Sequence, residues 1–185
     1  MVLKIHLLML DFLRVFGGQQ GMPHSAILMQ ADIFYGIDRD DIERIAKICQ
    51  ERTYRDGETI FEENSSGDEL YVIAEGEVEI LVDPAMVSDQ EDIRTEERII
   101  ARLRRGQSFG EIALVDQGIR SATARSASKN THLLVIPREE ILSLCEDDPL
   151  LGYRLMRNLA ADLSMKLRGT DFHLRDQLLH EGTTH

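Results

Sequence analysis

Short apolar runs alternate with glycine-containing turns between residues 53 and 136, and this pattern constrains the fold more than any other feature of the chain. The clearest unit is a predicted hairpin, in which an apolar run at 70–74 and an alternating run at 77–82 flank a Glu-Gly turn. Successive side chains of a strand face opposite sides of a sheet. The apolar residues of the second run are therefore expected to share one face: Val78, Ile80 and Val82.

Further short strands with the same spacing complete the predicted β region. They are expected at 59–61, 98–103, 122–128 and 133–136. Regularly spaced short strands with glycine turns are typical of a sandwich or jelly roll. We predict an α+β, mainly β fold, an eight-stranded β-roll of the double-stranded β-helix type. The polar, acidic segment 83–98 is expected to be a long surface loop.

Helices are predicted on both sides of this roll. An apolar face with an Asp-rich first turn predicts a helix within 24–50. Pro137 and the glutamates after it predict the start of a second helix. A third follows Pro149 and could continue to about Leu179, with Gly169 as its weak point, which gives a C-terminal helical hairpin. Its leucine stripe fits either a core face or an interface.

The chain divides into three expected parts: a leader at 1–23, a folded domain at 24–168, and a helical extension or tail at 169–185. The leader is apolar enough for a signal peptide to be conceivable. Charged and polar residues interrupt it, however, so we interpret it as an amphipathic helix or an over-long start before Met22 or Met29. No stretch is predicted to span a membrane.

Composition weighs against several functions. The net charge of −12 disfavours nucleic acid as the main partner. The two cysteines, Cys49 and Cys145, have no metal or redox spacing and suggest reduced thiols in a cytoplasmic protein. The six histidines are scattered, which disfavours a metal-dependent jelly-roll enzyme, and no nucleophile–base spacing is useful. We predict a protein that is not an enzyme and uses no metal or cofactor.

The segment 108–125 carries the most chemistry. Gly110 allows close backbone approach to a ligand, and the residues after it can form a helical turn whose free N–H groups favour an anion. Arg120 lies among small residues that let its side chain reach inward, where its fork matches phosphate oxygens. Taken alone, Glu111 and Arg120 could equally be a surface ion pair of little energetic value.

The complete pattern resembles the cyclic-nucleotide-binding domain family. The resemblance rests on FGEIAL at 109–114 and RSATA at 120–124, which are similar to the phosphate-binding cassette of that family. Upstream, GETIF at 57–61, GDELYVI at 67–73 and GEV at 76–78 match the first half of the domain. We use the name cassette for residues 108–125 below.

The resemblance implies a β-roll and a ligand, cAMP or, less favoured, cGMP. It implies that Glu111 accepts the ribose 2′-hydroxyl, that Arg120 pairs with the cyclic phosphate, and that the amides of Ala113 and Ser121 meet phosphate oxygens. The implied ligand-binding set is Gly110, Glu111, Ile112, Ala113, Arg120, Ser121 and Ala122. Val72 and Leu81 are weaker candidates for the base side, and the residue covering the base could be Lys166, Arg168 or Thr170.

The sequence also departs from the family pattern. Ile119 stands where relatives often have proline before the arginine, and the 83–98 loop is longer than usual. From the residues after the second C-terminal helix we expect no helix-turn-helix. We expect a regulatory module that signals to a protein partner through its C-terminal helices, with a possible homodimer through the last one. The alternative is a ligand-free interaction or scaffold domain with the same fold.

Overall fold

The computed structural model describes residues 22–84, 97–116 and 119–181. Most of the predicted leader (1–23) and most of the predicted loop (83–98) therefore lie outside the described residues. The helices are α2 (His24–Leu28), the 3-10 turn η1 (Asp32–Phe34), α3 (Arg39–Ile48), α4 (Ile112–Val115), α5 (Arg138–Asp147) and α6 (Pro149–Glu181). The strands are β1 (Gln50–Tyr54), β2 (Thr59–Phe61), β3 (Glu69–Glu75), β4 (Glu77–Val82), β5 (Arg98–Arg104), β6 (Ser108–Phe109), β7 (Thr123–Ser126) and β8 (Thr131–Pro137).

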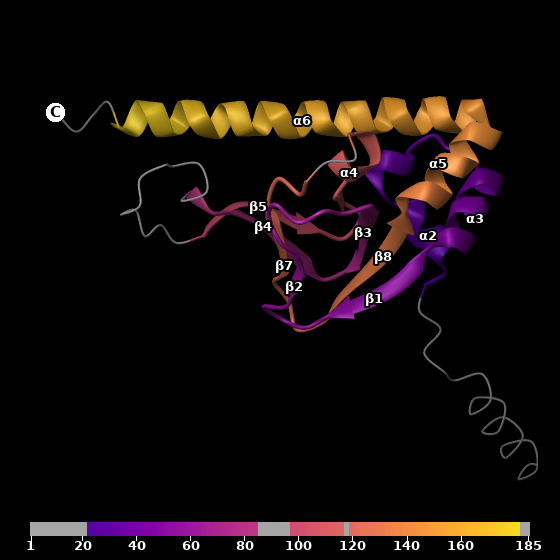
Figure 1. The fold of residues 1–185 in the computed structure, drawn as a ribbon, viewed down its shortest axis with the longest axis horizontal. Helices are drawn as coiled ribbons and strands as arrows, with labels where there is room; N and C mark the ends of the chain where they lie inside the picture. Colours follow the sequence, from indigo (N-terminus) through magenta and orange to yellow (C-terminus); the bar gives the residue numbers. More distant parts are fainter. Residues whose placement is uncertain (1–21, 85–96, 117–118, 182–185) are drawn as a thin grey trace, which may run out of the picture.

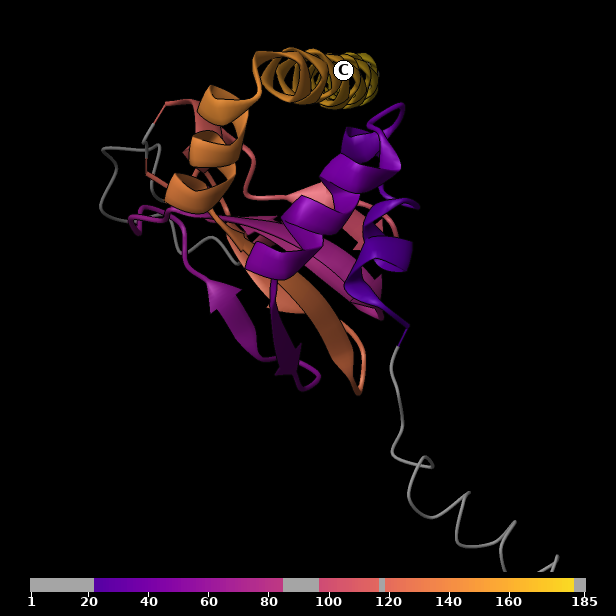
Figure 2. The same cartoon turned by 90° about the vertical axis from the view of Figure 1, so that its right-hand side faces the viewer.

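The strands form two antiparallel four-stranded sheets, in the orders β1-β8-β3-β6 and β2-β7-β4-β5. The prediction of a mainly β roll with helices on both sides is confirmed. Figure 1 shows α3 and α5 at one end of the roll and α6 running across it and beyond its far edge. In Figure 2, which faces that end, α3 and α5 stand side by side beneath α6.

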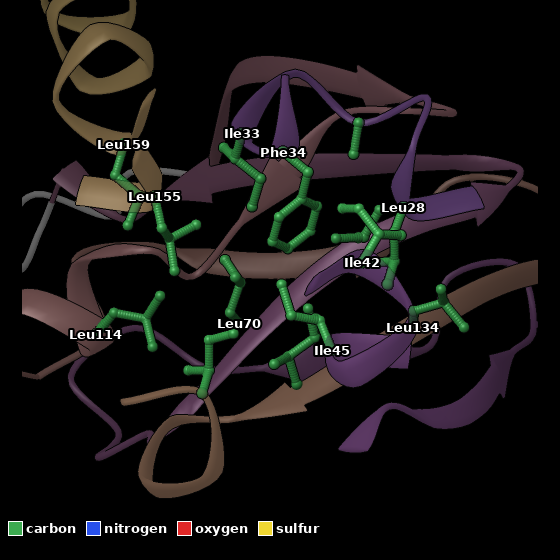
Figure 3. Packing of buried hydrophobic residues seen from close by; sticks show 14 of the residues in the cluster. Leu28, Ile33, Phe34, Ile42, Ile45, Leu70, Leu114, Leu134, Leu155 and Leu159 are labelled. Carbon is green, nitrogen blue, oxygen red and sulfur yellow. The ribbon is translucent and has the colours of Figure 1, made fainter. Parts of the chain in front are cut away.

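Strands β3 and β8 supply two apolar cores because their side chains alternate. Leu70 and Val72 face a cluster shared with the helices, whereas Tyr71 and Ile73 face a second cluster inside the roll. Figure 3 shows the first cluster, in which Leu155 and Leu159 of α6 approach residues of η1, α3 and β3. The helical layer is thus attached to the same strands that line the interior of the roll.

The strict alternation predicted for the second hairpin strand is wrong. Val78 and Leu81 are the buried residues of β4, whereas Ile80 and Val82 are only partly buried. The pairing of β4 with β5 shifts between Ile80 and Leu81, as in a β-bulge. A bulge adds one residue to a strand and inverts the facing of those beyond it.

The segment 24–50, predicted to be helical with a second part that begins at Asp38, is only partly helical. The segment is divided into α2, η1 and α3. Gly36, between η1 and α3, has a φ of +71°, a left-handed conformation that is incompatible with a continuous α-helix. Gln50 begins β1, which lies at the edge of its sheet and pairs only with β8. This strand was missed because its sequence, QERTY, lacks apolar alternation.

The predicted C-terminal hairpin is present as α5 and α6, and α6 continues through Gly169. Leu151, Leu155 and Leu159 are buried, but Leu167 is 63% exposed, so the leucine stripe leaves the core after two turns. The domain boundary at 168/169 stays a prediction. No helix in the described ranges is long and apolar enough to cross a membrane.

Ile45→Val should lower the free energy of unfolding by about 0.5–1.5 kcal/mol, since it removes one methylene from a fully buried site on α3. Urea denaturation measures the change. Ile99→Val is the matched control because Ile99 is largely exposed, and it should change the unfolding free energy by less than about 0.5 kcal/mol. Equal effects at the two sites would contradict the assigned core.

Candidate functional site

A cavity of about 530 Å³ lies between the cassette, strands of the second sheet and α6. That volume falls within the range of small-molecule sites, which is about 300–1,000 Å³. The cavity is lined by Phe61, Ile80, Ile100, Ala101, Leu103, Phe109, Gly110, Glu111, Ile112, Ile119, Arg120, Ser121, Ala122, Leu163, Lys166, Leu167, Gly169 and Thr170. All but one of the predicted ligand residues are among them, and the other, Ala113, lies in α4.

The main chain of Arg120 is fixed by the turn that precedes β3. The Arg120 amide donates to the carbonyl of Ser65 at 2.8 Å, and the Asn64 amide donates to the carbonyl of Arg120 at 2.8 Å. An isolated bridge between Ser66 and Ile119 continues this pairing. The backbone of Arg120 is therefore fixed by hydrogen bonds at both its amide and its carbonyl, and its side chain enters the roll from there. This holds although Ile119 stands where proline was expected from relatives.

The guanidinium of Arg120 is buried, and the whole residue is only 5% exposed. Nη1 donates to the carbonyl of Gly110 at 3.2 Å and Nη2 to the carbonyl of Glu69 at 3.0 Å, whereas the buried Nε has no hydrogen-bond partner. Within the described part of the chain, no carboxylate forms an ion pair with this group. Because buried charges are normally paired, the cavity is electrostatically suited to an anion.

An aromatic ring and two glycines shape the space around the guanidinium. Its Cζ lies 4.2 Å from the centroid of the Phe61 ring, within cation–π range. A Cβ at Gly67 would lie 2.2 Å from Nε, and one at Gly110 would lie 2.7 Å from Nη1. A side chain at either position would therefore displace the guanidinium from its place in the cavity.

A second hydrogen-bond network holds Glu69, whose main-chain carbonyl accepts a hydrogen bond from Nη2 of Arg120. The Glu69 carboxylate accepts two hydrogen bonds from Arg52, at 2.9 and 2.5 Å, and one from the hydroxyl of Tyr71 at 2.5 Å. Burial alone would raise the pKa of Glu69, but the hydrogen bonds from Arg52 and Tyr71 outweigh it and lower the pKa. Glu69 thus stays ionised while its main-chain carbonyl faces Arg120.

Glu111 lines the cavity and is buried where the cassette contacts α6. Its Oε1 accepts a hydrogen bond from Nζ of Lys166 at 2.9 Å. Glu111 and Arg120 both line the cavity, but the ion-pair partner of Glu111 is Lys166 rather than Arg120. The alternative of a surface ion pair between Glu111 and Arg120 is therefore wrong.

The structure differs from the sequence prediction on the apolar side of the cavity. Val72 and Leu81 are buried and are absent from its lining. The apolar lining comes instead from residues that sequence reasoning missed: Phe61, Ile80, Ile100, Leu103 and Leu163. Phe61 could have been suspected because it ends the GETIF run, but its position over Arg120 depends on contacts between distant segments.

Of the three candidates on the last helix, Lys166 and Thr170 line the cavity, whereas Arg168 is exposed and does not. The hydroxyl of Thr170 donates to the carbonyl of Lys166 at 3.1 Å. No cluster of three or more metal-ligating side chains is found in the described ranges.

Comparisons with known proteins point to one family. Residues 51–148 match the family described as cyclic nucleotide-binding domain. The chain is 34% identical over 142 residues to the cyclic AMP receptor protein of Thermus thermophilus, covering 77% of this chain and 60% of that protein. It thus spans less than two thirds of that relative's length.

Solved structures give the same result. The regulatory domain of Toxoplasma gondii PKA, crystallised with cAMP, superposes with a TM-score of 0.56 at 26% identity, covering 68% of this chain and 44% of that one. A cyclic nucleotide-binding domain from Methylobacillus flagellatus superposes with a TM-score of 0.69 at 21% identity, covering 83% and 82%. The second likeness concerns the fold alone.

Proposed function

The chain belongs to the cyclic nucleotide-binding domain family, and we propose that it is a cytoplasmic regulatory module that binds cAMP in preference to cGMP and is not an enzyme. One observation carries the proposal: Arg120 is buried beside a cavity with an unsatisfied Nε and no carboxylate partner among the described residues. A cyclic phosphate supplies the missing negative charge and an acceptor for that donor.

Each predicted ligand residue has a role in this proposal. Arg120 binds the cyclic phosphate, with the amides of Ala113 and Ser121 as further donors, and Gly110 lets the nucleotide approach the backbone. Glu111 accepts the ribose 2′-hydroxyl through the oxygen that Lys166 does not use. The remaining members of the set, Ile112 and Ala122, complete the wall.

Two observations support cAMP over cGMP. The relative from Thermus thermophilus is a cyclic AMP receptor protein, and the Toxoplasma gondii domain was crystallised with cAMP. In addition, the hydroxyl proton of Thr170 is already donated to the carbonyl of Lys166, so this hydroxyl offers lone pairs to a ligand. Lone pairs suit the amino group at position 6 of adenine and oppose the carbonyl at the same position of guanine.

Helix α6 is the proposed route to a protein partner. It contacts the cavity through Lys166, Leu167 and Thr170, and it exposes Met165 on the same segment. An exposed apolar side chain on this helix suits a helical partner, including a second copy of α6 in a homodimer. A nucleotide changes the position of α6 to the extent that it binds one arrangement of the helix more tightly than another.

Thermal unfolding with and without millimolar cAMP or cGMP tests the proposal. We expect a higher melting temperature with cAMP and a smaller rise with cGMP, because a ligand that binds only the native state stabilises it by mass action, by about 2.7 kcal/mol at a hundred times Kd. Arg120→Leu is the control and should show a smaller shift, because its affinity for cAMP is reduced. No shift with either nucleotide would favour the ligand-free scaffold.

A further inference from the structure

Lys166 joins α6 to the cassette through its ammonium group, which also forms an ion pair within α6. Nζ lies 2.9 Å from Oε1 of Glu111, 3.1 Å from the carbonyl of Ser108 and 2.8 Å from Oδ2 of Asp162. Ser108 and Glu111 belong to the cassette, whereas Asp162 precedes Lys166 by one turn of α6. The ammonium therefore bridges two segments that are 55 residues apart in sequence.

This contact differs from an ordinary surface ion pair. The side chain of Glu111 is only 7% exposed, and that of Lys166 is 35% exposed. Burial alone would lower the pKa of Lys166, but the charges of Glu111 and Asp162 outweigh it and raise the pKa. Lys166 is thus held in its charged form, and its removal would leave the buried side chain of Glu111 without this cation.

The donor count shows how Lys166 can act on a ligand. An ammonium has three donors, and two of them already have acceptors in the cassette, so a bond to a nucleotide made with either would break a link between α6 and the cassette. The contact with Asp162 is an ion pair in which Oδ2 of Asp162 accepts no hydrogen bond. A carboxylate, in contrast, has further acceptor sites. Glu111 can keep its bond to Lys166 through Oε1 and accept a hydroxyl proton at Oε2.

We propose that Lys166 is a positioning residue for ribose recognition: it holds Glu111 for the 2′-hydroxyl and thereby makes the position of α6 part of the site. This inference rests on the proposed function. It also predicts how the position of α6 affects ribose binding. Displacement of α6 moves Lys166 away from Glu111 and thereby weakens the bond between Glu111 and the ribose. Ribose binding and the docked position of α6 therefore favour each other.

The test compares cAMP with 2′-deoxy-cAMP by calorimetry. The native chain should prefer cAMP, and Lys166→Met should lower the affinity for cAMP by about fivefold while leaving that for the deoxy ligand nearly unchanged, since the bond between the 2′-hydroxyl and Glu111 is weakened rather than lost. Lys166→Arg, which keeps a cation, should retain the preference. Arg168→Met removes an exposed cation from the same helix and should change neither affinity.

The preference for cAMP is the ratio of the cAMP and 2′-deoxy-cAMP affinities of the same variant. A smaller folded fraction lowers both affinities equally and leaves this ratio unchanged. An equal loss for both ligands in Lys166→Met, or an unchanged preference, would overturn the positioning role. Absence of binding to either ligand by the native chain would instead overturn the proposed function. The two failures are therefore distinguishable.

Discussion

Arg120→Leu is expected to weaken cAMP binding by more than tenfold, because a hydrogen bond to a charged group contributes about 1.5–3 kcal/mol and the phosphate would lose its cation. The native chain already has a guanidinium with one unsatisfied nitrogen and no ion-pair partner in its described part. The leucine variant leaves the phosphate beside an apolar side chain. Calorimetric titration with cAMP measures the change.

Stability provides an independent check on the same substitution. If Arg120 served the fold, its loss would lower the melting temperature of the ligand-free protein. Our assignment predicts an unchanged or higher value, since leucine suits the apolar wall formed by Phe61 and the buried, partly unsatisfied cation is removed.

Arg125→Leu is the matched control for binding. Arg125 lies on the neighbouring strand β7, pairs with Glu97 at 2.6 Å and does not line the cavity. The control should leave the affinity for cAMP unchanged. An Arg120→Leu variant that binds cAMP as tightly as the native chain would remove Arg120 from the site.

The local parts of the fold could be predicted because each depends on neighbours in sequence. The turn at Gly76, with a φ of +91°, and the helical turn after Gly110, with a φ of +78°, follow from glycine at positions that need the left-handed region. The strands between such turns have apolar runs of strand length. These signals locate the cassette and the roll.

The remaining parts depend on contacts that no local pattern contains. Strand β1 is charged, and Arg52 within it is accommodated by Glu69, a partner 17 residues away. The predicted facing of the β4 side chains was wrong because the bulge depends on how β4 pairs with β5, and the sequence of β4 alone does not contain that pairing. A one-residue change of register exchanges the two faces of a strand, so alternation alone cannot assign them.

The candidate site divides in the same way. Its charged residues, Glu111 and Arg120, lie in a motif and could be identified. Their partners could not, because Lys166 is 55 residues from Glu111, and Phe61 reaches Arg120 from a different strand. The chemistry of the site was thus predictable, whereas its connection to α6 required the three-dimensional structure.

Gly67→Ala is expected to lower the affinity for cAMP about tenfold, close to the minimum loss expected for removing the Arg120 cation itself. The added Cβ would lie 2.2 Å from Nε and 2.4 Å from Cζ of Arg120. The atoms that it meets are the end of a flexible side chain, so the guanidinium moves away while the backbone stays. The melting temperature of the ligand-free protein should therefore change little, and calorimetry with cAMP measures the binding loss.

Two further variants separate this mechanism from general damage. In an Arg120→Leu background, Gly67→Ala should cause no additional loss of affinity, because the group that it displaces is already gone. Gly57→Ala introduces strain at a φ of +77°, where a Cβ would meet no atom within 4 Å, and should lower stability without changing the affinity for cAMP. Full affinity in Gly67→Ala would mean that cAMP binding does not depend on the position of the guanidinium between Phe61 and Gly67.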